Sequence, residues 1–129
     1  MRRFVVNRAT WANADTTSET MMLDPENGLM CCLGQICHQA KTPKSELAGN
    51  YEPCEVPIRA GYLVDLLLKD PDVPSAGSSD FAGKAMDIND NSDLMPRERE
   101  RALKKLFKSE GIDLSFVGRM PRRSGYAKL

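Results

Sequence analysis

Residues 96–117 read PRERERALKKLFKSEGIDLSFV and contain a helical pattern followed directly by a strand pattern. In the first part, Leu103, Leu106 and Phe107 recur at the three- and four-residue spacing of one helix face. A proline opens this segment and a glycine follows its last apolar residues, which is typical of helix boundaries. We therefore expect a helix over about 95–110 that buries its apolar residues in the core.

The exposed side of this predicted helix is highly charged. Glu98 lies three residues before Arg101, and Glu100 lies four residues before Lys104. Oppositely charged residues at these spacings can form ion pairs on a helix surface. The sequence therefore predicts that the acidic residues of the helix neutralise part of its positive charge.

Three short segments have the composition of β-strands. Apolar and polar residues alternate over 112–117, which predicts a half-buried strand. Aromatic and β-branched residues predict a second strand at 3–7, and a short apolar run predicts a third at 21–23. We expect these strands to form one short mixed sheet.

A second helical pattern lies between the predicted strands. The apolar residues of this segment fall on one helix face and predict a helix over 29–40. Together with the helix at 95–110, it is long enough to cover one face of a small sheet.

The 129 residues suffice for one domain. The sequence therefore predicts an α+β fold with a single small domain over 1–118 and a flexible, basic tail over 119–129. The residues expected in the core include Leu33, Ile36, Cys37, Leu103, Leu106 and Phe107.

The four cysteines, Cys31, Cys32, Cys37 and Cys54, raise the question of disulfides or a metal site. The N-terminal apolar run is too short for a signal peptide, and cytosolic proteins keep their thiols reduced. The cysteine spacing matches only part of the zinc pattern, which usually contains two distant pairs. Helical periodicity places Cys37 in the core as a small apolar residue. We therefore expect structural thiols and no bound metal or cofactor.

Neither a membrane segment nor a catalytic motif stands out. No apolar run approaches the roughly 20 residues that cross a bilayer, so we expect no membrane contact and a cytoplasmic location.

His38 is the only histidine. It neighbours Cys37 on a predicted helix, where adjacent side chains do not face each other, so a Cys–His nucleophile is disfavoured. The sequence therefore predicts a protein that is not an enzyme.

Charge is unevenly distributed although the net charge is zero. Residues 1–92 carry 8 basic and 13 acidic groups, whereas residues 93–129 carry 10 basic and 5 acidic groups. Such an asymmetry can orient the protein toward a partner, which is a host or phage protein or a nucleic acid, and the alternative is a helix with solvated charges followed by a basic tail. The candidate contacts are Arg97, Arg101, Arg119, Arg122 and Arg123, with Arg99, Lys104, Lys105 and Lys108 added for a nucleic acid.

Five residues near predicted element ends are candidates for special roles. Trp11 is the only tryptophan. Because tryptophan is enriched at interface hot spots, Trp11 is a candidate partner contact, and the alternative is a core anchor beside the first strand. Asn7 and Arg8 are expected to act structurally, by tying the end of this strand to a turn at Asn89 and Asp90.

Four segments together resemble a family of small proteins encoded by tailed bacteriophages and prophages. They are Asn7-Arg8-Ala9-Thr10-Trp11, Leu23-Asp24 with Gly28-Leu29-Met30-Cys31-Cys32-Leu33-Gly34, Ile88-Asn89-Asp90-Asn91, and Leu106-Phe107-Lys108-Ser109-Glu110-Gly111-Ile112. The resemblance covers most of residues 4–117, and the Met-Cys-Cys-Leu-Gly run is its most distinctive part. It implies a phage origin and the cytoplasm of a bacterial host, and it implies no particular reaction.

These observations favour a non-enzymatic phage accessory protein that binds a host or phage protein. Inhibition of a host defence system, in the manner of anti-CRISPR proteins, is a candidate role by analogy of size and origin. The alternative is a nucleic-acid-associated regulator that uses the basic C-terminal third of the chain and binds nucleic acid weakly.

Overall fold

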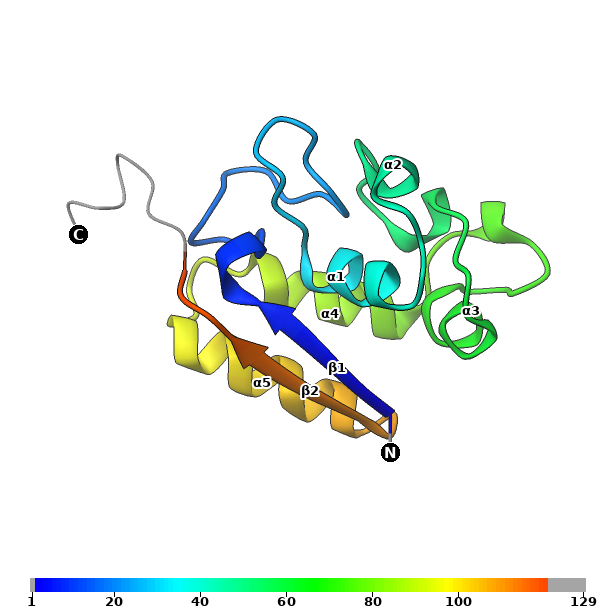
Figure 1. Cartoon of the computed structure of the whole chain (residues 1–129). Coiled ribbons are helices and arrows are strands. Elements are labelled where there is room, and N and C mark those ends of the chain that lie inside the picture. Colours follow the sequence, from blue (N-terminus) through cyan, green and yellow to red (C-terminus); the bar gives the residue numbers. More distant parts are fainter. Residues whose placement is uncertain (1, 121–129) are drawn as a thin grey trace.

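Two parallel strands form the sheet of this protein (Figure 1). The computed structural model describes residues 2–120. In it, β1 (Arg2–Asn7) pairs along its length with β2 (Ile112–Val117), with Arg2 opposite Ile112. Both strands therefore begin at the same end of the molecule, and most of the chain lies in the connection between them.

The connection between the strands is helical. Within the described residues, its α-helices are α1 (Cys32–Gln39), α2 (Lys44–Leu47), α3 (Gly61–Leu67), α4 (Asp80–Asp90) and α5 (Pro96–Lys108). Its short 3-10 helices are η1 (Arg8–Thr10), η2 (Pro53–Glu55) and η3 (Pro74–Ala76). α1 packs against β1, α5 packs against β2, and α4 contacts both of these helices.

Only one face of the sheet is buried. The side chains that point into the core are Phe4, Val6, Ile112, Leu114 and Phe116. The residues between them are exposed or partly exposed, and α1 and α5 pack on the buried face. This confirms the predicted α+β class, a small single-domain fold in which two main helices cover one face of a short sheet.

The two main helices are slightly shorter than the sequence predicts. α5 begins at Pro96, where the Glu98 carboxylate accepts the Met95 N–H at 2.9 Å. α1 begins at Cys32 instead of at position 29, because the preceding residues bond to another segment: the Met30 N–H donates to the carbonyl of Thr10 at 2.8 Å.

The predicted core residues lie in one apolar cluster. Five of them are fully buried: Leu33, Ile36, Cys37, Leu103 and Phe107. Leu106 is partly buried and packs at the edge of this cluster. The ring of Phe107 meets the ring of Phe81 edge-on, with 5.0 Å between their centroids, which joins α5 to α4.

The segment at 21–23 is not a strand, and the sheet of the described residues is purely parallel instead of mixed. Leu23 forms only an isolated bridge with Ala48. Met22 is fully buried, and its carbonyl group lies directly against Gly34 of α1. The apolar run therefore reflects packing against a helix, which requires the same residue types as pairing with the sheet.

The outer edge of β1, where a third strand would pair, is occupied by two glutamine side chains of α1. Gln39 accepts the Val5 N–H through Oε1 at 2.9 Å, and its Nε2 donates to the carbonyl of Val5. One turn earlier, Gln35 accepts the Asn7 N–H at 2.7 Å and donates to the Asn7 carbonyl at 3.0 Å. These bonds satisfy the outward backbone groups of Val5 and Asn7, which blocks the addition of a strand along this part of the β1 edge.

Gly34 of α1 marks a tight contact that the sequence pattern does not reveal. A Cβ atom at this position would lie 1.9 Å from the carbonyl oxygen of Met22, far inside van der Waals contact. We expect Gly34→Ala to lower the free energy of unfolding by at least about 2 kcal/mol, the scale of overpacking in a core. Urea unfolding followed by circular dichroism measures this change.

Gly83→Ala in α4 is the matched control. Apart from the adjacent residues and the backbone of its own helix, no atom lies within 4 Å of the position that a Cβ atom would take there. Alanine favours a helix interior over glycine by about 0.5–1 kcal/mol, so this variant should be as stable as the parent or more stable. Equal stability of the two alanine variants would contradict the importance of the Gly34 contact.

Candidate functional site

Five basic side chains of α5 are exposed, and we call them the basic surface: Arg97, Arg101, Lys104, Lys105 and Lys108. Four of them recur at intervals of four, three and four residues, which is the spacing of one helix face. The opposite side of α5 is buried through Leu103 and Phe107. The packing of α5 therefore turns the basic surface toward solvent.

The acidic residues of α5 do not neutralise this surface. The predicted pairs of Glu98 with Arg101 and of Glu100 with Lys104 are wrong, because Glu98 bonds to the helix start and Glu100 bonds to Arg8. Across residues 2–120, no carboxylate oxygen lies within 4.0 Å of a nitrogen of the basic surface. The basic surface therefore keeps its positive charge.

The ion pair of Arg8 and Glu100 ties the end of β1 to α5. The guanidinium donates from Nε and Nη2 to the two carboxylate oxygens, both at 2.7 Å, and from Nη1 to the carbonyl of Gly118 at 3.1 Å. The Arg8 and Glu100 side chains are 30% and 17% exposed. The hydrogen bond to Glu100 raises the pKa of Arg8 above its ordinary value. The pair thus fixes α5 against the ends of both strands.

Two adjoining grooves run along the basic surface. The larger has a volume of about 530 Å³ and is lined by Lys104, Lys105, Lys108, Ile112, Asp113 and Leu114. The smaller has a volume of about 230 Å³ and is lined by Arg97, Glu100, Arg101 and Lys104. Lys104 lines both grooves, so the basic surface borders two neighbouring recesses, and the larger of them lies between α5 and β2.

The predicted contact residues are distributed over several places. Arg97 and Arg101 belong to the basic surface. Arg119 is exposed and directly follows Gly118, whose carbonyl accepts a hydrogen bond from Arg8. It therefore lies close to the ion pair of Arg8 with Glu100, near the N-terminal end of α5. Arg122 and Arg123 lie outside the described residues, as does the predicted tail from residue 121 onward.

Arg99, which the sequence groups with the surface cations, is fully buried. Its Nη1 donates to the carboxylate of Asp15, and its Nη2 donates to the carbonyls of Asn91 at 2.8 Å and Leu94 at 3.1 Å. A buried guanidinium requires partners of this kind. Arg99 therefore joins two loops of the fold, and its charge is not available to a partner.

Trp11 is fully buried, which corrects the prediction that it contacts a partner. Its ring packs against the ring of Phe116 with 4.9 Å between their centroids. Its indole Nε1 donates to Oδ1 of Asn89 at 2.7 Å. A tryptophan that is desolvated and hydrogen-bonded in this way serves as a core anchor, the alternative that the sequence left open.

The side chain of Asn89 joins three segments in the core. Its Oδ1 accepts the indole N–H of Trp11 and also the N–H of Cys32 at 3.2 Å. Its Nδ2 donates to the carbonyl of Ala12 at 2.9 Å and to Asp90 at 2.9 Å. Asn89 therefore connects the end of α4 with the start of α1 and with the segment after η1.

Asn7 and Asp90 make contacts other than those the sequence suggested. Asn7 bonds through its backbone to Gln35, and its side chain accepts the N–H of Ala9 at 3.0 Å at the start of η1. Asp90 accepts the hydroxyl of Thr20 at 2.6 Å. The predicted tie from Asn7 and Arg8 to a turn at Asn89 and Asp90 is thus wrong. Arg8 bonds to Glu100 of α5, and Trp11 is the residue that bonds to Asn89 near the end of α4.

The four cysteines are free thiols, and three of them are buried. Burial raises the pKa of Cys31 to about 11 and that of Cys37 to about 12, because a desolvated thiolate is unfavourable. Cys54 is partly exposed.

His38 bonds through Nδ1 to the carbonyl of Thr42 at 3.0 Å. Among the residues described by the structure, no three His, Cys, Asp or Glu side chains are grouped to hold a metal.

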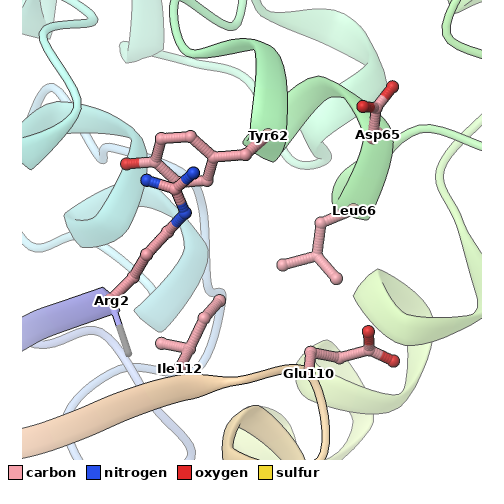
Figure 2. Close-up of a pocket in the computed structure, with 6 residues that line it drawn as sticks. All are labelled: Arg2, Tyr62, Asp65, Leu66, Glu110 and Ile112. Atoms are coloured by element: carbon pink, nitrogen blue, oxygen red, sulfur yellow. The ribbon is translucent and has the colours of Figure 1, made fainter.

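A separate pocket of about 250 Å³ opens where α3 meets the start of the sheet (Figure 2). The guanidinium of Arg2 lies over the ring of Tyr62, 3.6 Å from the ring centroid. In Figure 2, Leu66 reaches toward the middle of the pocket, and the carboxylates of Asp65 and Glu110 lie at its rim. Because Arg2 is already stacked and both carboxylates are exposed, these residues do not select a particular ligand.

Comparisons with known proteins do not add a family to this description. No family model matches the chain, and no curated protein or solved structure is significantly similar to it. Within the described part of the chain, no helix is long and apolar enough to span a bilayer. The basic surface and its grooves are therefore the candidate site on physical grounds alone.

Asn89→Ala should strongly destabilise the core. It leaves the indole N–H of Trp11, the N–H of Cys32 and the carbonyl of Ala12 without their partner, and each buried unsatisfied group costs about 1–3 kcal/mol. We expect the free energy of unfolding to fall by at least about 3 kcal/mol, measured by urea unfolding and tryptophan fluorescence.

Asn91→Ala is the control for this variant, since Asn91 is exposed and its side chain accepts only the N–H of Asp93 at 2.8 Å. This change should cost less than about 1 kcal/mol, as for an ordinary exposed hydrogen bond. A similar loss in both variants would argue against the central role of Asn89.

Burial should also control the chemistry of the thiols. In the folded protein, a disulfide reagent should label Cys54 first and the three buried thiols only after unfolding. The raised pKa of Cys31, about 11 against an ordinary 9.0, means that the folded chain retains a proton that the unfolded chain releases at high pH. Stability should therefore be complete below about pH 9 and decrease as the pH rises toward 11. Thermal unfolding across this pH range measures the change in stability. Uniform labelling of all four thiols in the folded protein would contradict the burial of Cys31, Cys32 and Cys37.

Proposed function

We propose that this protein acts without catalysis, by binding an acidic region of another protein through the basic surface of α5. The observation that supports this proposal is the uncompensated charge, because five exposed cations lie together and have no carboxylate partner within residues 2–120. The net charge of the whole chain is zero, so this charge is a local feature. Complementary charge accelerates association and discriminates against wrong partners.

The shape of this region is also suitable for an interface. The recess of about 530 Å³ beside α5 has the apolar residues Ile112 and Leu114 in its lining and lysines around it. Protein interfaces combine a partly apolar centre with a polar rim, and arginine is enriched among their strongest contacts. We therefore expect Arg97 and Arg101 to contribute to affinity and the lysines to assist the approach of the partner.

The resemblance to tailed-phage proteins favours a host or phage protein in the bacterial cytoplasm as this partner. In that setting, the protein is a phage accessory protein. Inhibition of a host defence complex, in the manner of anti-CRISPR proteins, is a role that a small binding protein of this kind can perform, and this part of the proposal rests on analogy of size and origin.

A second candidate function, binding of nucleic acid, is favoured by the spacing of the cations along one helix face. Cations at successive helical turns can follow a phosphate backbone. The structure reduces the number available, since Arg99 is buried and Arg8 is paired with Glu100. We therefore expect affinity for DNA or RNA to stay in the non-specific range of about 10⁻⁴–10⁻⁶ M at physiological salt.

Charge reversal tests the proposed function. The test variant carries Arg97→Glu, Arg101→Glu and Lys104→Glu. The control carries Lys44→Glu, Lys69→Glu and Lys84→Glu, which change the same number of exposed cations on other parts of the surface. After nuclease treatment, cross-linked capture from phage-infected cells should recover a protein with the parent and the control, and about tenfold less of it with the test variant. Equal recovery with all three forms would contradict the proposal.

A titration of the parent with DNA and RNA at several salt concentrations separates the two functions. Weak binding that disappears near physiological salt agrees with a protein partner. Nanomolar binding at physiological salt, reduced by the test variant only, would replace the first proposal with the second.

A further inference from the structure

The register of the sheet determines which backbone groups of β2 point outward. In a parallel pair, the N–H and C=O groups of alternate residues point toward the neighbouring strand, and those between them point away. Val5 of β1 points away, since its backbone bonds to Gln39 of α1. Val5 lies opposite Ser115, so Ser115 points toward β1. The residues of β2 whose backbone groups point outward are consequently Ile112, Leu114 and Phe116.

These three residues form what we call the open edge of the sheet. Within residues 2–120, no hydrogen bond joins their N–H or C=O groups to a segment outside the pairing with β1. On the outer edge of β1, the corresponding groups of Val5 and Asn7 are satisfied by Gln39 and Gln35. A strand edge with unpaired groups is a template for another extended chain.

The groove beside the open edge is positively charged. Three lysines, Lys104, Lys105 and Lys108, and one carboxylate, Asp113, line it together with Ile112 and Leu114, so positive groups outnumber negative ones. Ile112 is 3% and Leu114 is 2% exposed, so neighbouring side chains cover the open edge and have to move aside before a strand can enter. The residues of α5 that line the groove here are the three lysines. Lysine has a long, flexible stem and keeps its charge in the new position, so it can contact the strand that displaces it.

We propose that β2 accepts an extended acidic segment of the partner protein as a third strand. This inference rests on the proposed function and specifies its chemistry. The backbone of the segment pairs with the open edge, and its carboxylates meet the three lysines of the groove. Strand addition is a general mode of peptide recognition, in which main-chain bonds give affinity and alternate side chains give specificity.

The surroundings of the open edge favour a strand over a helix as the occupant. Successive side chains of a strand point to opposite faces. One face of an added strand therefore meets α5 and its lysines, whereas the other continues the exposed face of the sheet, where Val117 is 48% exposed. Acidic residues on the first face and β-branched apolar residues on the second fit both environments.

The test uses the full chain and a short, capped, fluorescent peptide of alternating Glu and Val. A second peptide of the same sequence carries a methyl group on every backbone nitrogen, which keeps the charge and removes the main-chain donors. We expect fluorescence anisotropy at low salt to show the first peptide binding about tenfold more tightly or better. A Lys104→Glu, Lys105→Glu and Lys108→Glu variant should lose binding of the first peptide by a similar factor.

Amide hydrogen exchange measured by NMR gives a readout that charge attraction alone would not change. Adding the Glu–Val peptide should slow exchange by about tenfold or more at Ile112, Leu114 and Phe116. The amides of Val5 and Asn7, on the opposite edge, should be unaffected because glutamine already bonds them.

The outcomes separate this inference from the proposed function. Equal binding of the two peptides with unchanged exchange at the open edge, or no binding of either peptide, would overturn strand addition and leave an acidic partner of another shape. Equal binding of the Glu–Val peptide by the parent and the lysine variant would also overturn strand addition beside the lysines, whereas the proposed function is decided separately by the capture experiment with the Arg97, Arg101 and Lys104 variant. Displacement of the peptide by duplex DNA at physiological salt would overturn both proposals, in favour of a nucleic-acid partner.

Discussion

The side-chain amide of Asn89 is the interaction on which the arrangement of the core depends. It lies near the end of α4 and bonds to the indole of Trp11 and to the backbone at the start of α1. These groups are buried, so each needs a partner, and one amide supplies both an acceptor and a donor. Because Trp11 also packs against Phe116 of β2, this amide couples the sheet to α1 and α4. An apolar residue of similar size could fill the space but could not satisfy these groups.

Once the core is fixed, the two edges of the sheet differ because of the residues that the neighbouring helices place beside them. α1 is held where Gln35 and Gln39 reach the backbone of β1, and a glutamine amide can both donate and accept. The residues of α5 that line the groove beside β2 are lysines, which donate only. Lysines therefore cannot satisfy the N–H groups of a strand edge. Glutamine on α1 therefore closes the edge of β1 at Val5 and Asn7, whereas lysine on α5 leaves the edge of β2 open.

The sequence predicts those parts of the fold that depend on local periodicity. The sequence correctly predicts α1, α5 and β2, because in each of these elements the spacing of the apolar residues matches the face that is buried. The segment at 21–23 is misassigned because a short apolar run has the same composition whether it packs on a sheet or, like Met22, on a helix. The candidate site is only partly predictable. Arg97 and Arg101 follow from the helix pattern, whereas the burial of Trp11 depends on Asn89, which is 78 residues away in sequence.

The pairing of Glu100 shows how the fold creates the charge of the candidate site. Helix spacing alone allows Glu100 to pair with Lys104, which would cancel charge within the surface of α5. Arg8, 92 residues away, takes both carboxylate oxygens instead and holds α5 against the ends of the strands. The contact that positions the helix therefore also leaves the cations uncompensated. Clustered like charges repel each other and oppose folding, and carboxylates of a bound partner would relieve this repulsion. Positioning of the helix and the charge used in the proposed binding thus have the same structural origin.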